Sequence, residues 1–447
     1  MSSIVSRRVF LKLSAGSAAA AAVACQGVPS GQEHPTGRMR HGAVGVGGMG
    51  AADLASISDH DQVDVICLCD VDAGRLKAAG EKHPTARLYA DWREMLEVEG
   101  DNLDSVCVST PDHMHAPVTM AALRMGKHVY CQKPLTHTVV EARAVREAAQ
   151  EAGVVTQMGI QNRSNVHYRT AKALFDTGVT GPVSSMHVWT DRPAGWWPQD
   201  VDRPEGSDPI PEDLAWNLWL GVAPSRPFKK DAYHGFVWRG RKDFGTGAQG
   251  DMACHLMDPA LWFPELGDPL TVRSEGPKPK ADSFPLWSRV HYTFAPTAST
   301  AAQGAELTWY DGARKPDELL KRLGIEDAFP NACLFVGDKA ALLVSPYAPC
   351  RLFPLGEAET ELDIKQVPAV NHWHQWVDAC LGKGQTTAGF DYAGKLSEVA
   401  LLGNVALEFP EQDLPWDAAG LQFPGHPEAD LLLHKTYRHG WRSAGLS

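Results

Sequence analysis

The stretch 40–50 (RHGAVGVGGMG) decides the fold, because it places a Gly-x-Gly-x-x-Gly pattern directly after a short apolar run. In such a pattern the first glycine permits a tight turn, the second lets the backbone approach a pyrophosphate, and the third allows close helix–strand packing. A helical stretch, 51–58, follows, and the amides at its start would bind phosphate oxygens. The pattern therefore predicts a Rossmann-type dinucleotide site that contains Gly45, Gly47, Gly48, Met49 and Gly50.

A second apolar run, 63–69 (VDVICLC), ends directly before Asp70. A carboxylate at this place accepts hydrogen bonds from the ribose hydroxyls and repels a 2′-phosphate, so Asp70 favours NAD over NADP. A glycine-rich hexad alone also occurs as an ordinary turn in other α/β proteins. The preceding strand, the following helix and the strand-terminal aspartate together favour the dinucleotide interpretation.

The alternation of strands and helices continues beyond Asp70. Strands are expected at 105–110 and 128–131, and helices at 117–125 and 139–152. Right-handed crossovers between parallel strands place the strand ends along one edge, where ligands bind in doubly wound sheets. We therefore predict an α/β fold that begins with a parallel, nucleotide-binding sheet.

Two of these strand ends carry residues suited to chemistry. Thr110-Pro111-Asp112-His113-Met114-His115 follows one strand, and Gln132-Lys133-Pro134 follows the other. The residue before a proline is held out of the α region, which restricts the direction of the Lys133 side chain. A lysine in the cleft could exchange a proton with a substrate hydroxyl, whereas the simpler alternative is a surface lysine in a turn. Contacts to the cofactor are expected from Thr110, Pro111, His115 and Lys133.

The histidines of this region raise the question of a metal. His113 and His115 could be ligands, but no set of Cys, His and Asp completes a tetrahedral zinc site. The sequence therefore predicts no metal, and it leaves His113 as a candidate for substrate contact.

The composition restricts the class of protein further. A length of 447 residues suits two domains. The formal net charge of −12 disfavours a nucleic-acid partner, because such a protein needs a basic face. No run of eighteen apolar residues occurs, so we expect no bilayer span in the mature chain.

The first 25 residues are typical of an export signal. Arg7-Arg8 is followed by a mild Ala-rich run, 13–24, which is too short for a transmembrane helix. The run ends in AVAC, which is either an Ala-x-Ala cleavage site or a loose lipobox with Cys25 acylated. We predict a twin-arginine signal at 1–25, a linker at 26–38 and a periplasmic, optionally lipid-anchored protein. Because Cys67, Cys69 and Cys107 lie in apolar runs, we expect buried free thiols.

In this order the glycine pattern, Thr110-Pro111-Asp112-x-x-His115 and Lys133-Pro134 resemble the Gfo/Idh/MocA oxidoreductases, which include glucose–fructose oxidoreductase and inositol dehydrogenase. The resemblance covers most of 39–447 and is strongest to exported, sugar-associated members. The motifs that support the latter are Trp216-x-x-Trp219-Leu220-Gly221, Trp238-Arg239-Gly240, Gly250–Asp258 and Tyr437-Arg438-His439-Gly440-Trp441.

The resemblance implies a Rossmann domain at 39–158 and a C-terminal α/β domain at 159–447. The second domain is expected to contain an open, mostly antiparallel sheet whose free face serves a homo-oligomer. The catalytic pattern of the family maps onto Lys133, Asp251 and His255. One departure is Gln132, where many members have Glu, and a neutral neighbour stabilises an ammonium less than a carboxylate does.

Asp251 and His255 are four residues apart, so on a helix they share one face. Hydride removal from a secondary alcohol needs a hydride acceptor, a base for the proton and a donor to the developing oxyanion. NAD would be the acceptor, His255 the base with a pKa near neutrality, and Lys133 the donor. Asp251 would orient the imidazole or bind a neighbouring hydroxyl. A solvated Asp–His pair and two metal ligands are the alternatives for the same spacing.

The substrate is expected to be a carbohydrate, because aromatic rings stack on the apolar faces of sugars. The predicted function is an NAD(P)-dependent oxidoreductase that acts on a hydroxyl of a sugar, polyol or glycoside, with retained cofactor. One alternative is an NAD-dependent glycoside hydrolase that works by transient oxidation, elimination and re-reduction. The other is a non-catalytic sugar-binding protein. Candidates for substrate contact are His113, Arg163, Tyr168, Tyr233 and Trp238.

Overall fold

The computed structural model describes residues 37–355, 365–443, 445 and 446. The predicted export signal, Cys25 and all but the last two residues of the predicted linker lie outside the described residues. None of the helices in the described ranges combines the length and the apolarity that a bilayer span needs. The eight cysteines of those ranges are free, and seven of them are buried.

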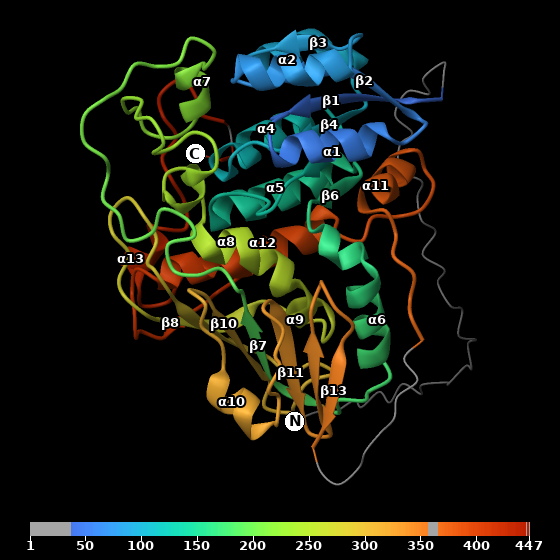
Figure 1. The fold of residues 1–447 in the computed structure, drawn as a ribbon, viewed down its shortest axis with the longest axis vertical. Coiled ribbons are helices and arrows are strands. Elements are labelled where there is room, and N and C mark those ends of the chain that lie inside the picture. The colour runs from blue at the N-terminus through green and yellow to red at the C-terminus, as the bar shows by residue number, and fades with distance from the viewer. Residues whose placement is uncertain (1–36, 356–364, 444, 447) are drawn as a thin grey trace, which may run out of the picture.

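The N-terminal part is a six-stranded parallel sheet in the order β3-β2-β1-β4-β5-β6 (Figure 1). Its strands are β1 Met39–Val44, β2 Val63–Cys69, β3 Arg87–Tyr89, β4 Ser105–Val108, β5 His128–Cys131 and β6 Thr156–Met158. The connecting helices are α1 Met49–Ser58, α2 Ala73–Lys82, α3 Trp92–Glu99, α4 His115–Arg124 and α5 Val139–Ala152. The strand order reverses next to β1, so a ligand crevice is expected beside β1 and β4.

Alternate residues of these strands enter two separate cores, one on each face of the sheet. Val44, Cys67 and Val108 pack in the core that includes α3, α4 and α5. Ala43 and Leu68 pack in the other core with α1 and α2. Burial on both faces explains why these strands are continuous apolar runs.

The C-terminal part contains an eight-stranded sheet in the order β13-β12-β11-β7-β10-β9-β8-β14. Only β7 and β10 pair in parallel; the other neighbours are antiparallel, as the resemblance implied. The strands are β7 Val183–Trp189, β8 Pro269–Glu275, β9 Arg289–Phe294, β10 Ala305–Tyr310, β11 Ala332–Gly337, β12 Ala340–Val344, β13 Arg351–Pro354 and β14 Leu414–Pro415.

A layer of helices joins the two sheets (Figure 1). It contains α8 and α12, which pack on each other, and α12 also packs on α5 and β8. The helices of the C-terminal part are α6 Val166–Phe175, α7 Trp216–Leu220, α8 Gly247–Leu256, α9 Asp258–Trp262, α10 Asp317–Arg322, α11 His372–Cys380, α12 Phe390–Ala406 and α13 Pro427–Asp430. One continuous core runs from the first sheet through this layer to the second, which fixes α8 relative to the parallel strands.

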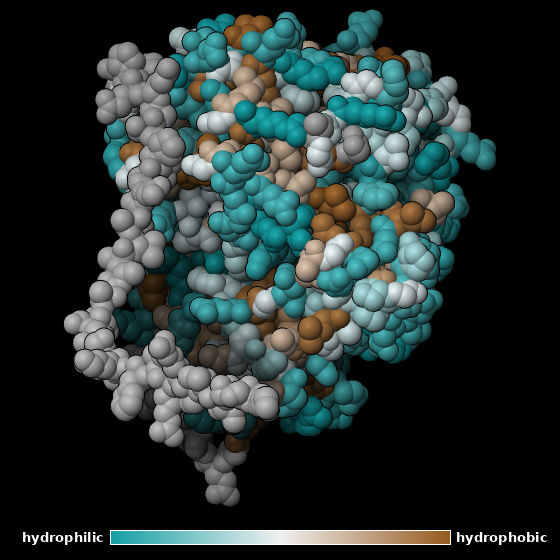
Figure 2. All heavy atoms as spheres, turned by 180° about the vertical axis from the view of Figure 1, so that it is seen from behind, coloured by the Kyte–Doolittle hydropathy of each residue, from teal (hydrophilic) through white to brown (hydrophobic). Residues whose placement is uncertain are grey.

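The surface behind the view of Figure 1 is mostly hydrophilic, with hydrophobic side chains in small groups (Figure 2). Single exposed apolar residues are normal on globular proteins. A deep cleft lies at the carboxyl ends of the parallel strands.

Candidate active site

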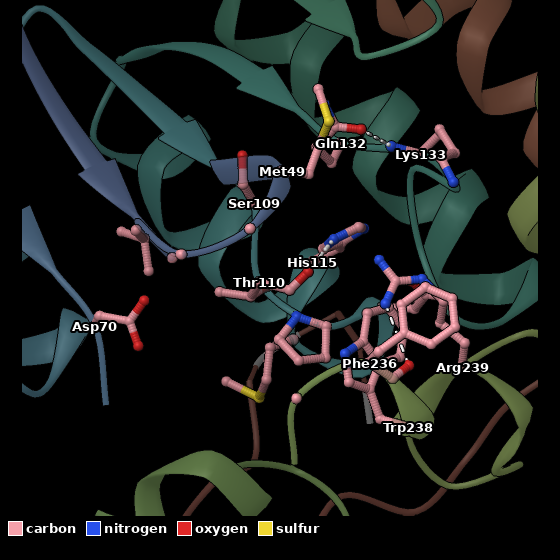
Figure 3. A pocket seen from close by; sticks show the side chains of 18 of the residues that line it. Met49, Asp70, Ser109, Thr110, His115, Gln132, Lys133, Phe236, Trp238 and Arg239 are labelled. Carbon is pink, nitrogen blue, oxygen red and sulfur yellow. Dashed lines mark hydrogen bonds between the residues drawn. The ribbon is translucent and has the colours of Figure 1, made fainter. Parts of the chain in front are cut away.

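A cleft of about 710 Å³ lies where the carboxyl ends of β1, β2, β4 and β5 face α8 and the loops around α7 (Figure 3). The sequence-predicted residues that line it are Gly45, Gly47, Gly48, Met49, Asp70, Thr110, Pro111, His115, Lys133, Trp238, Asp251 and His255. Gly50 is not among the residues that line the cleft. It packs closely against the glycine turn, since a Cβ at Gly50 would lie 1.9 Å from the backbone oxygen of Gly45. This agrees with the packing role expected for the third glycine.

The glycine turn fits a diphosphate. Gly45 and Gly48 have φ angles of 82° and 55°, which favour glycine. A Cβ at Gly48 would meet no described atom within 4 Å, so the turn presents bare backbone there. Among the described residues, no side chain caps α1 and no acidic residue lies in its first turn, which leaves the helix end suited to an anion.

Asp70 directly follows β2 at the wall of the cleft. Its carboxylate accepts hydrogen bonds from the amides of Val46 (2.9 Å) and Asp72 (3.0 Å). Burial raises the pKa of Asp70, while these amide hydrogen bonds act in the opposite direction. The carboxylate is therefore held in one orientation beside the glycine turn.

His115 connects the two reactive strand ends. Its Nδ1 lies 2.7 Å from the Pro134 oxygen and its Nε2 lies 2.8 Å from the Thr110 oxygen. The nitrogen that carries the proton donates to one of these backbone oxygens, and the ring lies between the two turns. The Thr110 hydroxyl oxygen, by contrast, is buried without a hydrogen-bond partner among the described residues, as expected for an atom that awaits a ligand.

Lys133 forms an ion pair with Asp251 across the cleft. Its Nζ donates to Asp251 Oδ1 (2.6 Å) and to the Asp251 backbone oxygen (2.8 Å). The other carboxylate oxygen accepts from Trp197 Nε1 (3.1 Å), and Arg239 Nε lies 3.6 Å from Oδ1. Burial favours the neutral acid, but Lys133 and Arg239 outweigh it and lower the pKa of Asp251 to about 2. Asp251 therefore positions the ammonium, and the expectation that it orients the His255 ring is corrected.

His255 lies one helical turn after Asp251 on α8, and both line the cleft. Its Nδ1 is buried without a partner among the described residues. Burial, with a contribution from Lys133, lowers the pKa of His255 to about 3. The expected near-neutral pKa was therefore wrong, and the imidazole is neutral at physiological pH.

The departure at Gln132 has a structural reason. Its side-chain amide donates to both carboxylate oxygens of Asp53 on α1, at 2.9 and 2.8 Å. Asp53 is fully buried and also accepts from Ser109 and Trp373. A glutamate at position 132 would place a second carboxylate against Asp53, so the amide is the residue type that fits.

Asp112 is a cleft residue that the sequence analysis quoted but did not assign. Its carboxyl accepts from Thr246 Oγ1 at 2.6 Å, and burial raises its pKa to about 7. The signal was available, since Asp112 follows a strand end as Asp70 does. A carboxyl that titrates near neutrality in a cleft is a candidate for proton exchange.

Four of the five candidates for substrate contact lie outside the described lining of the cleft. His113 is buried against Trp219 and Phe244. Tyr233 belongs to the same aromatic core, where Arg226 approaches its ring. Packing among large rings thus explains both residues, which corrects their assignment.

Arg163 and Tyr168 support α8 from behind. The Tyr168 hydroxyl donates to the His255 backbone oxygen at 3.0 Å. Arg163 is buried, pairs with Asp258 and lies between the rings of Trp262 and Tyr392. These residues hold the helix that carries His255, and they do not face the cleft.

The fifth candidate, Trp238, does line the cleft, with the Arg239 guanidinium 4.3 Å from its ring. Trp196, Phe236 and Tyr347 line the same cleft and are 45%, 48% and 63% exposed. They are the aromatic members of the exposed large hydrophobic side chains in the described ranges. Exposed rings gathered at one cleft indicate a binding surface.

Within the described ranges, no three His, Cys, Asp or Glu side chains come together in a way that could hold a metal ion. The groups that surround the cleft are instead an ammonium, a neutral imidazole, carboxylates and a glycine turn. Such a set suits a dinucleotide and proton transfer at a hydroxyl.

Two family models match the chain. The model described as "Oxidoreductase family, NAD-binding Rossmann fold" matches residues 39–160, and "Oxidoreductase family, C-terminal alpha/beta domain" matches 168–311. Together they span more than half of the chain. The inositol 2-dehydrogenase of Salmonella typhimurium is 31% identical over 152 residues, which are 33% of this chain and 45% of that protein. The match thus spans less than half the length of this curated relative.

Solved structures resemble the chain over both parts. The WlbA dehydrogenase from Bordetella pertussis, in complex with NADH and UDP-GlcNAcA, superposes with a TM-score of 0.60 at 17% identity, covering 85% of this chain and 99% of that one. The aldose–aldose oxidoreductase from Caulobacter crescentus, complexed with glycerol, has a TM-score of 0.57 at 17% identity and covers 85% and 100%. At such identities the likeness establishes the fold.

Proposed function

We propose, from the premise that this chain belongs to the Gfo/Idh/MocA oxidoreductase family, that it oxidises a hydroxyl of a sugar, polyol or glycoside with NAD. The observation that carries the proposal is the ion pair between Lys133 Nζ and Asp251 Oδ1, at 2.6 Å, in the cleft that the glycine turn borders. It presents an ammonium where a substrate oxygen would lie beside the cofactor.

The residues of the cleft divide between cofactor and substrate. The turn Gly45–Met49 and Asp70 would hold the diphosphate and the ribose, and Thr110 offers its unpartnered hydroxyl. When bound, NAD would accept a hydride from the carbon that carries the hydroxyl and return it in the reverse direction.

The residues of the protein stabilise the substrate oxygen and accept its proton. Lys133 Nζ donates a hydrogen bond to the substrate oxygen and stabilises negative charge as it develops there. The neutral His255 ring accepts the hydroxyl proton first, and the Asp112 carboxylate in the same cleft, whose pKa burial raises to about 7, takes up the released proton afterwards. Asp251 holds Lys133 in place through their ion pair.

The substrate is proposed to be a carbohydrate. The exposed rings of Trp196, Phe236 and Tyr347 offer apolar faces of the kind that pack against sugar C–H groups. The names of the similar proteins support a hydroxylated substrate, since inositol is a cyclic polyol and an aldose is a sugar.

We also propose export by the twin-arginine route, with NAD retained through the catalytic cycle. The support is Arg7-Arg8 before the Ala-rich run. Outside the cytoplasm, free dinucleotide is scarce, so a hydride taken from one hydroxyl is best returned within the same protein. Replacing both arginines with lysine should retain the protein in the cytoplasm, as cell fractionation would show; unchanged export would contradict the route.

A redox-neutral cycle leaves room for a second function, an NAD-dependent glycoside hydrolase. Oxidation of a ring hydroxyl acidifies the neighbouring C–H, permits elimination of the aglycone and ends in re-reduction. The exposed rings at the cleft favour this candidate, because they offer surface for a second group beside the reacting sugar.

One experiment separates these functions. The purified full-length protein is incubated with NAD and a panel of inositols, aldoses and chromogenic glycosides. The reduced-nicotinamide absorbance band reports dehydrogenation, and release of chromophore without net NADH reports the hydrolase. Binding of sugars with neither signal, unchanged in Lys133→Met, would contradict enzymatic function.

The assembly and the anchor are proposals as well. The outer face of the second sheet carries polar cross-strand pairs such as Thr271–Thr293 (2.7 Å) and His291–Glu275 (3.0 Å) near β8 and β9. We propose that this face joins two copies in a homo-oligomer, and that Cys25 is acylated. Light scattering tests the first proposal, where a monomer would contradict it. Mass spectrometry of the mature N-terminus tests the second, where cleavage without acylation would contradict it.

A further inference from the structure

The C-terminal segment 433–443 returns to the first sheet after α13. The amide of Val140 on α5 donates to the Leu433 oxygen at 3.0 Å. The buried Glu141 carboxylate then accepts from the Tyr437 hydroxyl at 2.6 Å and pairs with Lys435 at 3.2 Å. Two residues of the segment thus bind one buried carboxylate, which attaches the segment firmly to the nucleotide-binding domain.

The same segment is also fastened to α7. The Arg438 guanidinium donates to the Gly221 oxygen (2.9 Å) and to Asn217 Oδ1 (2.7 Å), and the Arg438 amide donates to the Val222 oxygen (3.0 Å). The chain therefore crosses from α5 to α7 along the rim of the cleft.

Three residues later, Trp441 lines the cleft. It does so together with Ala90, Asp91 and Trp92, and the Arg93 guanidinium lies 4.1 Å from the Trp441 ring. The amide of Asp70 donates to the Tyr89 oxygen at 3.2 Å, which places this wall directly beside Asp70. Trp441 thus stands at the same end of the cleft as the Asp70 carboxylate, whereas Lys133 follows β5 at the other end.

A second connection closes the same end. The turn 71–73, next to Asp70, pairs with the loop 213–215: Ala73 donates to the Asp213 oxygen (2.8 Å) and Ala215 donates to the Val71 oxygen (2.9 Å). The end of the cleft beside Asp70 is therefore bordered by two segments that the C-terminal part contributes.

We propose that Trp441, with Trp92 beside it and Arg93 packed on its ring, forms a binding site for the adenosine half of NAD, and that the segment 433–443 holds the cofactor in the protein. This inference rests on the proposed function, since it presumes that the cleft takes NAD. A ring beside a base contributes by stacking, which corresponds to about a tenfold to hundredfold change in affinity. Such a site would also explain the retention of NAD without reference to the export signal.

The test measures which half of the cofactor depends on Trp441. Full-length protein freed of nucleotide is titrated calorimetrically with NAD, AMP and nicotinamide mononucleotide. Trp441→Ala should weaken AMP and NAD binding by about tenfold or more and leave the mononucleotide unaffected. Unchanged AMP affinity, or equal weakening of both halves, would overturn the proposal.

The matched control is Trp287→Ala. Trp287 also lies under an arginine, with Arg314 3.6 Å from its ring, but it lies outside the described lining of the cleft. It should leave all three affinities unchanged. Tyr437→Phe removes the hydroxyl that donates to Glu141, although Tyr437 itself does not line the cleft. The segment is then attached less firmly, so NAD should dissociate faster even though Trp441 is unchanged. An unchanged dissociation rate would count against the segment as the element that retains NAD.

Failure of this inference differs from failure of the proposed function. AMP binding that depends on Trp441, with no sugar in the panel oxidised, would leave the adenosine site standing and remove the activity. Sugar oxidation with AMP binding indifferent to Trp441 would do the reverse.

Discussion

The two walls of the cleft are built in different ways. The wall from the first sheet consists of short contiguous motifs at the ends of β1, β2, β4 and β5, and much of it is backbone. The opposite wall consists of side chains such as Trp196, Phe236, His255, Tyr347 and Trp441, which come from segments far apart in the chain. The first wall is therefore determined locally, whereas the second depends on how the loops of the C-terminal part pack.

This difference suggests that the first wall mainly binds the cofactor and the second wall mainly binds the substrate. A backbone turn suits a constant ligand such as a diphosphate, because any change of side chain leaves its amides in place. Side chains on loops suit a substrate that varies among relatives. The ion pair of Lys133 with Asp251 links the two walls at the reacting end of the cleft, so its removal should have the largest effect on activity.

Lys133→Met should lower kcat by about 10²–10⁴-fold, which is the usual contribution of a positioned proton donor. The NAD affinity should change little, since the glycine turn and Asp70 remain. Stopped-flow measurement of hydride transfer and calorimetric titration with NAD check the two halves of this expectation. Lys172→Met on α6 removes a lysine paired with a neighbouring aspartate and serves as the control. If Lys133→Met lost NAD binding and Lys172→Met did not, Lys133 would be a cofactor-binding residue and not the donor to the substrate oxygen.

Gln132→Glu tests the buried support of that lysine. It places two carboxylates within about 3 Å in a buried site, which should cost about 3 kcal/mol in the free energy of unfolding. Asp53→Asn combined with Gln132→Glu exchanges amide and carboxylate and should restore most of the loss. Chemical denaturation of the three variants measures the coupling. Additive effects in the double variant would show that the two side chains do not act as a pair.

The sequence predicted the first wall well because its signals are local. The strands 63–69 and 128–131 and the helix 139–152 have the predicted bounds, and α5 has its capping box and a left-handed Gly153 at its ends. The helices after the glycine turn and after Pro111 each begin two residues earlier than predicted, at Met49 and His115. Period and turn chemistry are sufficient for such elements.

The second wall was predicted only in part. Asp251 and His255 emerged from their spacing and the family pattern, but the partner of Asp251 is Lys133, which no spacing along the chain reveals. Arg163 and Tyr233 were named as candidates for substrate contact, but the type of a residue does not tell whether it faces a cleft or a core. Trp441 was quoted only as part of a motif, because its place depends on the course of the whole C-terminal segment.

Gly50→Ala and Gly48→Ala distinguish packing from backbone conformation within the first wall. A Cβ at Gly50 would lie 1.9 Å from the Gly45 oxygen, so α1 must shift, at a cost of about 2 kcal/mol, with loss of NAD affinity. A Cβ at Gly48 meets no described atom within 4 Å, and its cost is the strain of φ 55°, about 1 kcal/mol. Thermal melts with and without NAD check the order. A larger loss for Gly48→Ala would mean that backbone strain dominates over contact.

Asp112→Asn addresses the smallest effect, a few-fold change with pH. Burial raises the pKa of Asp112 from 3.8 to about 7, so the folded protein holds its proton through the window between these values. The stability that this protonation contributes is present below pH of about 4 and lost as the pH rises through about 7. The unfolding free energy of Asp112→Asn should therefore increase relative to that of the wild type as the pH rises across that window.

The ionised carboxylate can take the proton that oxidation releases, so the oxidation rate of the wild type should rise through pH of about 7, and Asp112→Asn should lack this rise. His255, with a pKa of about 3, is neutral throughout and cannot produce the limb. A pH–rate profile of kcat/KM for both proteins shows which residue titrates. If the rise near pH 7 persisted in Asp112→Asn and disappeared in His255→Gln, the titrating group would be His255 on α8 and not Asp112 after β4.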